Sequence, residues 1–289
     1  MKIGISLGVL RPSLWAEATR QADRLGYESV WMPEHLVLPV QATGSPYAGS
    51  DHPPIPPDVS VFDVFTYLAF LAGQTDRIHF GTHVYNIGLR HPFITARAVT
   101  TLDIVSSGRV EFGIGASWLQ AEWEAVGLDF ASRGRRVDEA IGVCRRLWSE
   151  PVVGHHGEFF DFAPVMFEPK PTQSPWPPLH IGGDGPAALR RAALLGDGWI
   201  PMNHTVDQIP AAASRIAHLR QEAGRPGTVE ITLGAGAGRD DLRRCADAGV
   251  GRALVKPWTT GREALEGIRR FAEEVLPEVR DHPVAAPAR

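Results

Sequence analysis

Eight short apolar segments alternate along this chain with segments of helical periodicity, and this alternation constrains the fold more than any other feature. The apolar segments are residues 2–8, 29–33, 78–84, 109–115, 179–181, 199–202, 229–234 and 252–256. Strands that alternate with helices pair in parallel through right-handed crossovers, and eight such units close into a barrel. The sequence therefore predicts an α/β fold, a single (β/α)8 TIM barrel over residues 1–280, with a flexible tail at residues 281–289.

Two stretches interrupt the alternation, residues 36–58 after the second strand and residues 150–177 before the fifth. The first is rich in proline and has no periodicity, which is typical of an irregular surface excursion and often of a lid. An open doubly wound sheet is the alternative architecture. It is disfavoured because residues 4–7 lack the G-x-G-x-x-G spacing that a dinucleotide-binding sheet needs after its first strand.

Charge and cysteine content narrow the classes of partner. The net charge is −4, with both signs interspersed, so the chain has no basic footprint for nucleic acid and no cationic face for a membrane. No apolar run approaches the roughly 20 residues that span a bilayer. Both cysteines lie in helical patterns, and Met1 leads directly into a strand. We therefore expect a cytoplasmic protein without disulfides that acts on a small molecule.

The strongest functional pattern lies in residues 178–202, PLHIGGDGPAALRRAALLGDGWIPM. A short apolar strand runs into Gly182, Gly183, Asp184 and Gly185, after which Pro186 opens a helix. Glycines let the backbone approach a ligand closely, and free amides at a helix amino terminus attract an anion. A glycine-rich turn is also a common tight connection, so the pattern alone is consistent with a phosphate site or with a purely structural turn.

The other polar residues of interest follow the ends of the predicted strands, where barrel proteins place their function. Glu34 and His35 end the second strand, residues 83–86 follow the third, and residues 115–118 follow the fourth. These strand ends bring aromatic side chains, a histidine and the glycine turn to one space. The combination suits a planar, phosphate-bearing cofactor with one titratable group beside it.

Four motifs carry a family resemblance over nearly the whole chain: WMPEHLVLP, RIHFGTHVYNIGLRHP, GRVEFGIGASWLQAEWEAVGLDFASRGRRVDEAI and IGGDGPAALRRAALLGDGWIP. They resemble the luciferase-like monooxygenase superfamily, and within it the oxidoreductases that use coenzyme F420, a deazaflavin. The resemblance implies a barrel with both insertions, a homodimer, and hydride transfer between coenzyme F420 and a small organic substrate.

The resemblance also implies roles for individual residues. It makes His35 the group that takes a substrate proton, with Glu34 beside it as the second catalytic residue, and it implies a cis peptide bond from His83 to Val84 behind the deazaflavin ring. The residues that it places against the cofactor are His83, Val84, Gly115, Ala116, Trp118, Gly182, Gly183, Asp184 and Gly185, the last four through their backbone amides.

One position departs from the pattern of the resemblance. Alcohol and sugar-phosphate dehydrogenases of the deazaflavin group have an acid near the mouth of the fourth strand, and this chain has Trp118 at or beside that position. Enone or imine reduction is therefore as consistent with the sequence as alcohol oxidation. Two other functions stay open: an FMN-dependent monooxygenase on the same fold, and a non-catalytic protein that binds a flavin or deazaflavin.

Simpler interpretations compete with some of these assignments. His35 is also consistent with a core histidine at a strand end. His155 and His156 lack a third ligand at suitable spacing, so a solvated hairpin is expected there and no metal. The arginines of residues 133–136 are consistent with solvated charges at a helix start or with steering of an anionic cofactor tail.

Overall fold

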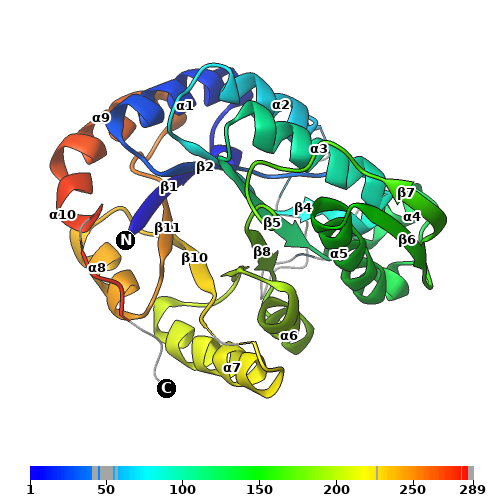
Figure 1. The fold of residues 1–289 in the computed structure, drawn as a ribbon. Coiled ribbons are helices and arrows are strands. Elements are labelled where there is room, and N and C mark those ends of the chain that lie inside the picture. Colours follow the sequence, from blue (N-terminus) through cyan, green and yellow to red (C-terminus); the bar gives the residue numbers. More distant parts are fainter. Residues whose placement is uncertain (41–44, 46–54, 56–57, 226, 281, 286–289) are drawn as a thin grey trace.

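The computed structural model describes residues 1–40, 45, 55, 58–225, 227–280 and 282–285. Eight parallel strands close into a barrel with helices around it, because β3 pairs with both β2 and β5 (Figure 1). These strands are β1 (Lys2–Ser6), β2 (Ser29–Met32), β3 (His79–Thr82), β5 (Val110–Gly115), β8 (Leu179–Gly182), β9 (Gly198–Ile200), β10 (Glu230–Ala235) and β11 (Arg252–Val255). The predicted TIM barrel is confirmed, with each strand within a few residues of its expected place.

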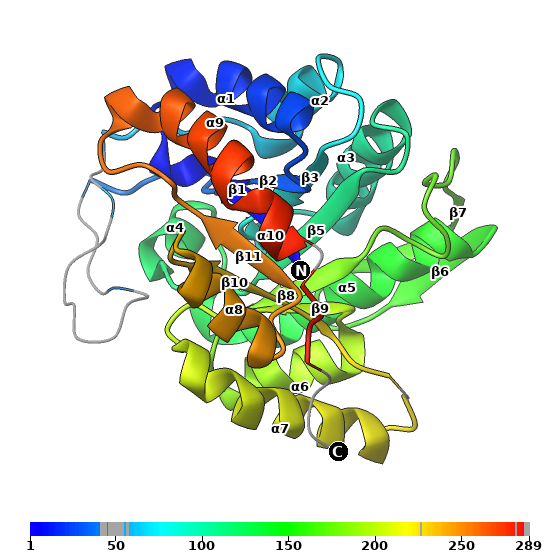
Figure 2. The same cartoon turned by 90° about the vertical axis from the view of Figure 1, so that its left-hand side faces the viewer.

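Helices cover the outside of the barrel (Figures 1 and 2). They are α1 (Pro12–Leu25), α2 (Val64–Ala72), α3 (Pro92–Val105), α4 (Gln120–Ala125), α5 (Arg133–Ser149), α6 (Pro186–Leu195), α7 (Ile209–Glu222), α8 (Arg239–Asp247), α9 (Ala264–Glu274) and α10 (Leu276–Arg280). Helix α6 begins at Pro186 and is followed by Gly196, as the sequence predicts. Within the described residues, no helix combines the length and apolar character that crossing a bilayer requires.

The second insertion contains an antiparallel hairpin of β6 (Val152–His156) and β7 (Asp161–Met166), which lies outside the barrel beside α5 (Figure 1). The two histidines lie on this hairpin, as expected, and each pairs with a carboxylate: His155 with Glu139 at 2.9 Å and His156 with Asp161 at 2.6 Å. Of the first insertion, the structure describes only residues 36–40, 45, 55 and 58, so the expected lid lies mostly outside the described residues.

The expected tail is only partly described. Within it, the Ala285 amide donates to the Ala246 carbonyl at 3.0 Å, and the Met1 ammonium donates to the His282 carbonyl at 3.0 Å. Residues 282–285 are therefore bound to the barrel, whereas residues 281 and 286–289 lie outside the described residues. The boundary at residue 280 stays a prediction.

Side chains fill the barrel interior in layers. Near the carboxyl ends of the strands, Trp31 packs with Ile200, Leu254 and Val84. Beneath it, the fully buried Arg252 guanidinium lies 5.1 Å from the Trp31 ring centre. Because an apolar layer faces the strand carboxyl ends, the floor of any site there is dry and rigid.

We call Arg252 with Glu28, Glu111 and Glu230 the Arg252 layer. The Arg252 guanidinium lies 2.9 Å from both Glu28 and Glu230 and 3.1 Å from Glu111. Burial opposes ionisation of Glu111, yet hydrogen bonds from His180 and His79 and the charge of Arg252 hold the pKa of its carboxyl well below its usual range. One buried cation therefore joins strands that are distant in the sequence.

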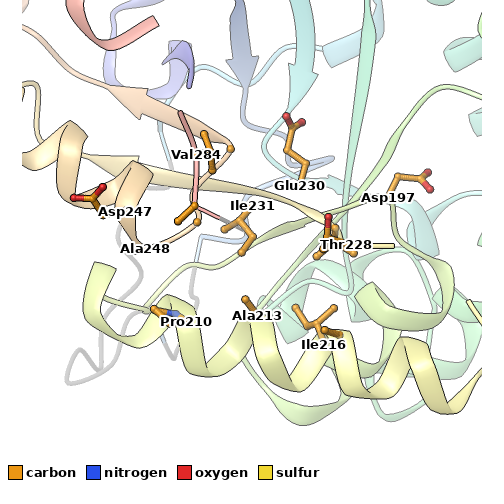
Figure 3. A pocket seen from close by; sticks show the side chains of 15 residues that line it. Asp197, Pro210, Ala213, Ile216, Thr228, Glu230, Ile231, Asp247, Ala248 and Val284 are labelled. Atoms are coloured by element: carbon orange, nitrogen blue, oxygen red, sulfur yellow. The ribbon is translucent and has the colours of Figure 1, made fainter. Parts of the chain in front are cut away.

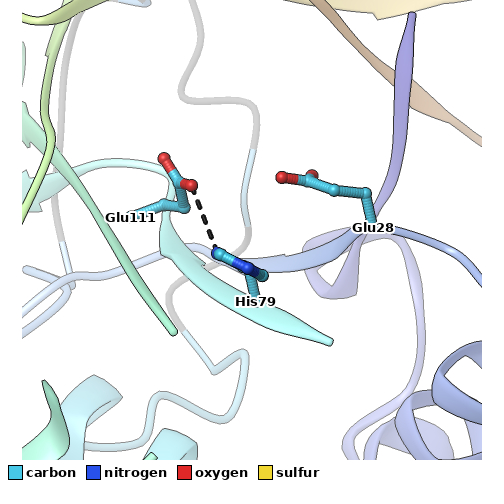
Figure 4. Close-up of side chains that lie close together, drawn as sticks. All are labelled: Glu28, His79 and Glu111. Atoms are coloured by element: carbon cyan, nitrogen blue, oxygen red, sulfur yellow. Dashed lines mark ion pairs between the residues drawn. The ribbon is translucent and has the colours of Figure 1, made fainter. Parts of the chain in front are cut away.

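Two groups in the Arg252 layer have ligand atoms close enough for a metal ion, Glu28 with His79 and Glu111 (Figure 4) and Glu111 with His180 and Glu230. Arg252 contacts the carboxylates of both groups. The guanidinium therefore already supplies the positive charge that these carboxylates attract. We interpret the layer as an internal ion-pair network of the barrel.

Candidate active site

Three strand ends converge on Val84. The peptide bond between His83 and Val84 is cis, as the resemblance implies, and it precedes the short strand β4 (Tyr85–Asn86). A Cβ atom added at Gly115 would lie 2.5 Å from Val84 Cγ2, and one added at Gly182 would lie 3.0 Å from Val84 Cγ1. Larger side chains at these two positions would displace Val84. The glycines thus let β5 and β8 close around it.

His83 belongs to the wall beneath this point. Its amide donates to the Met32 carbonyl at 2.8 Å, and its ring meets Trp31 edge to face at 6.3 Å. Burial lowers the pKa of His83 to about 4, so the ring is neutral at physiological pH. His83 therefore shapes the site without bringing a charge to it.

His35 is held by a buried carboxylate that the sequence interpretation did not identify. Its Nδ1 lies 3.1 Å from Glu122 Oε2, and the Leu36 amide donates to Glu122 Oε1 at 2.6 Å. Glu122 is fully buried. Because a carboxylate accepts hydrogen bonds, it fixes the proton on Nδ1 and leaves the Nε2 lone pair of His35 as the proton acceptor. This arrangement favours the functional interpretation of His35 over that of a core histidine.

Trp118 connects His35 to the end of β5. The Trp118 and His35 rings are 5.9 Å apart and perpendicular. Ala116 and Trp118 are both half-buried and follow Gly115 at the barrel mouth. Position 118 holds a tryptophan, but a carboxylate reaches His35 from α4, where Glu122 lies 3.1 Å from its Nδ1. The tryptophan at position 118 therefore does not leave His35 without a carboxylate partner.

Glu34 lies next to His35 in the sequence but has a different environment. One of its oxygens lies 2.6 Å from Arg90 Nη2, and the other accepts the Asn86 amide at 2.9 Å. Arg90 in turn stacks over Tyr85, with its guanidinium 4.6 Å from the ring centre. Both oxygens of Glu34 are thus engaged by β4 and its neighbours, which favours a positioning role over the predicted catalytic one.

Hydrogen bonds hold the glycine turn against β9. The Gly183 amide donates to the Ile200 carbonyl at 3.1 Å, and Trp199 Nε1 donates to the Gly183 carbonyl at 2.8 Å. Gly183 is therefore unavailable as the amide donor that the resemblance implies. In the part of the chain that the structure describes, the amides of Asp184, Gly185 and Ala187 have no acceptor. We call these three amides the phosphate seat, because they surround the amino terminus of α6.

The Asp184 side chain binds the connection after β9. Its carboxylate accepts the amides of Met202 at 2.8 Å and Asn203 at 3.1 Å, the Asn203 side-chain amide at 2.8 Å, and lies 2.9 Å from His204 Nδ1. Burial opposes its ionisation, but these donors hold the pKa of Asp184 below its usual value. Asp184 is thus a fixed negative charge beside the seat.

The turn gives a direct test of its geometry. Gly183 has φ +116°, and a Cβ there would lie 3.1 Å from Ala188 Cβ, so we expect Gly183→Ala to lower the free energy of unfolding by about 1–3 kcal/mol. Gly185, with φ −74° and open space around a Cβ, is the matched control, and Gly185→Ala should be neutral or stabilising by up to ~1 kcal/mol. Urea denaturation measures both; equal effects would contradict the assignment of strain to Gly183.

A cavity lies at the opposite end of the barrel. It has a volume of about 650 Å³ and lies between α7, the start of β10 and residues Val284 and Ala285 (Figure 3). Its acids are engaged by the chain: Glu230 pairs with Lys2 and Arg252, and Asp197 accepts the Leu179 amide. It lies at the amino ends of the strands, away from the residues described above, so we do not assign the reaction to it.

The arginines at the start of α5 have partners in the chain. Arg135 pairs with the exposed Glu158 at 2.8 Å, and Arg136 Nε donates to the Gly88 carbonyl at 2.8 Å. These contacts favour the interpretation as structural and solvated charges over the steering of a cofactor tail.

The fold and the site together define a (β/α)8 barrel whose candidate site lies at the carboxyl ends of its strands. Residues 10–250 match the model of the luciferase-like monooxygenase family. The chain belongs to this family, whose members are oxidoreductases.

Two relatives illustrate the similarity. An uncharacterized protein of Mycobacterium tuberculosis is 30% identical over 272 residues, which cover 90% of this chain and 93% of the relative. A phthiodiolone/phenolphthiodiolone dimycocerosates ketoreductase of a Mycobacterium species is 27% identical over 310 residues, covering 98% of this chain and 80% of the relative.

Solved structures share the fold. The monooxygenase RslO1 from Streptomyces bottropensis has a TM-score of 0.74 at 23% identity, covering 96% of this chain and 99% of its own. The coenzyme F420 dependent tetrahydromethanopterin reductase from Methanopyrus kandleri has a TM-score of 0.74 at 18% identity with the same coverage. The oxygenating constituent of 3,6-diketocamphane monooxygenase from Pseudomonas putida, in complex with FMN, has a TM-score of 0.65 at 19% identity. The match covers 82% of this chain and 67% of that one.

Proposed function

We propose that this protein is an oxidoreductase that binds coenzyme F420 at the barrel mouth and exchanges a hydride with a small organic substrate. When bound, the coenzyme supplies or accepts the hydride. The residues present fit such a group: Gly115 and Gly182 let Val84 stay in place between β5 and β8, and the phosphate seat offers three amides without an acceptor among the described residues. His83 and Val84 would lie behind the ring, and Ala116 and Trp118 beside it.

The observation that carries the proposal is the His35–Glu122 pair. Hydride exchange with a carbonyl or alcohol also moves one proton at the substrate oxygen, so the site needs one group that gives and takes that proton. His35 has its Nδ1 at 3.1 Å from Glu122, which orients the ring and stabilises the imidazolium that forms when Nε2 takes the proton. Trp118 packs against His35 and helps to exclude water.

The substrate class that this pair supports best is a ketone and its alcohol. The geometry supports it because a His–carboxylate pair suits proton exchange at oxygen, and the name of the ketoreductase relative is consistent with it. Enone and imine reduction need a proton donor in the same place, so they stay within the proposal as further substrates.

The principal alternative keeps the fold and replaces the coenzyme by FMN, which would make the protein a monooxygenase. The FMN complex of the diketocamphane enzyme supports this alternative, and the F420-dependent tetrahydromethanopterin reductase supports the first. Fluorescence titration of the purified protein with oxidised coenzyme F420 and with FMN separates them. We expect micromolar concentrations of the protein to quench the fluorescence of coenzyme F420. Tight binding of FMN alone, with oxygen uptake when the bound FMN is reduced, would overturn the proposal.

A non-catalytic cofactor-binding protein is the second alternative. It is disfavoured because Glu122, a buried acid, orients His35, and a protein that only bound the cofactor would not need an oriented histidine. The proposal includes a homodimer and a cytoplasmic location, both of which rest on the sequence. For the homodimer, sedimentation velocity should give twice the chain mass of 31.5 kDa.

A further inference from the structure

The phosphate seat has an unusual electrostatic feature, because a carboxylate lies within its own turn. Asp184 contributes one of the free amides, and its side chain carries a full negative charge that four donors hold in place. An anion bound to the Asp184 amide would lie roughly 5 Å from that carboxylate, since the amide and the carboxylate belong to the same residue. The seat thus combines attraction from backbone amides with repulsion from a fixed charge.

This combination discriminates between phosphates by their charge. The amides and the dipole of α6 attract one negative charge, and a second one on the same phosphate gains little from them while it meets Asp184 at short range. His204, the titratable group that faces Asp184 from the connection after β9, reduces this repulsion when protonated. Farther along α6, Arg191 is paired with Asp138 at 2.5 Å and is not directed to the seat.

We infer that Asp184 is a specificity-determining residue that makes the seat select a monoanionic phosphodiester over a dianionic phosphate monoester. The inference rests on the proposed function and deepens it. The phosphate of coenzyme F420 is a diester, and that of FMN is a monoester with two ionisations. Asp184 therefore favours the deazaflavin coenzyme through the charge of its phosphate, independently of the ring.

Two ring-matched probes test this selection in the unaltered protein. One is the deazaflavin riboside 5′-phosphate, a monoester whose second pKa is about 6, and the other is its methyl diester, which has no second ionisation. At pH 8 we expect the diester to bind about tenfold more tightly than the monoester in a fluorescence titration. At pH 5, where both probes are monoanions, the two dissociation constants should agree within about twofold.

The ratio of the two dissociation constants isolates the effect of the phosphate charge on affinity. At pH 5 both probes carry one negative charge, so protonation of His204 would strengthen the binding of both equally and leave the ratio near one. The second ionisation, present at pH 8, affects the monoester alone. A monoester that binds as tightly as the diester at pH 8 would overturn the inference. If coenzyme F420 binds in the same assay, that outcome leaves the proposed function standing; if neither coenzyme F420 nor the probes bind, both are wrong.

A pair of variants assigns the effect to one residue. Asp184→Asn removes the charge and keeps one oxygen for the Met202 amide, while its NH2 group replaces the oxygen that accepts the Asn203 amide. The tenfold preference at pH 8 should therefore disappear. Asp207→Asn is the control, since Asp207 lies in the same connection after β9 but is exposed and paired with Arg244. It should retain the preference. Circular dichroism confirms folding, and a preference that survives in folded Asp184→Asn would exclude Asp184 as its cause.

Discussion

Replacing Glu122 by glutamine is expected to lower kcat for ketone reduction by about 10²- to 10⁴-fold while the protein stays folded. Glutamine keeps an oxygen for the Leu36 amide, which now donates to Glu122 at 2.6 Å. Its NH2 group, however, would donate to His35 Nδ1 and move the imidazole proton to Nε2. For ketone reduction, the imidazolium of His35 that gives the proton would then lack the carboxylate that stabilises it. For alcohol oxidation, Nε2 would have no lone pair to take the substrate proton.

The measurement is steady-state turnover of a ketone and alcohol panel, followed by the absorbance of the deazaflavin, together with cofactor titration. We expect the cofactor dissociation constant to stay within about threefold of wild type, because Glu122 contacts His35 and not the phosphate seat. Glu124→Gln is the matched control, since Glu124 lies on the same helix and its carboxylate, among the described residues, is hydrogen-bonded only to Gln120 at the surface. Wild-type kcat in Glu122→Gln would remove the carboxylate from the mechanism.

A second readout separates the tautomer from a loss of structure. The ¹⁵N chemical shifts of His35 distinguish a proton on Nδ1 from one on Nε2, and they need no substrate. We expect the Nδ1–H form in the wild type and the Nε2–H form in Glu122→Gln. A merely structural role of Glu122 would lower activity without this exchange of tautomers.

Replacing Arg252 by methionine is expected to destabilise the barrel by about 3–5 kcal/mol, the largest stability effect that the structure supports. The guanidinium is fully buried and contacts Glu28, Glu111 and Glu230. Methionine fills a similar volume but leaves these carboxylates with no buried cation. Urea denaturation measures the change. Arg269→Met is the control, because the Arg269 pairs lie at the surface, where water screens them, and the substitution should change stability little.

The same variant should change how stability depends on pH. Burial opposes ionisation of Glu28 and Glu111, but hydrogen bonds and the charge of Arg252 hold the pKa of each carboxyl below its usual range. A lowered pKa adds stability that is present above the ordinary carboxyl pKa near 4.5 and is lost as pH falls toward the folded-state value. Wild-type stability from these groups should therefore be level from pH 8 to about pH 5 and fall below that.

In Arg252→Met, the uncompensated carboxylates favour protonation, so the difference in stability between variant and wild type should shrink as the pH is lowered. Unfolding midpoints at pH 8 and pH 5 measure this. A difference that is the same at both pH values, or a destabilisation below about 1 kcal/mol, would show that Arg252 acts through packing alone.

Local pattern determined the order of the elements. Short apolar segments bounded by glycine and proline fixed the eight strands, and Pro186 with Gly196 fixed the ends of α6, because turn and capping preferences act within a few residues. The family resemblance added the cis bond between His83 and Val84, which the structure contains. The predicted site residues Glu34 and His35, and the turn from Gly182, all lie at strand carboxyl ends, as the barrel requires.

Closure of the barrel decided what these residues do. Glu122 meets His35 across 87 residues and Arg252 meets Glu28 across 224, and no local pattern reports such a contact. The Gly183 amide is taken by Ile200 only because β8 and β9 lie side by side. The sequence thus determined which backbone would form and where its strands would end, whereas hydrogen-bond partners and charge pairs followed from long-range packing, which only the folded barrel brings within a few ångströms.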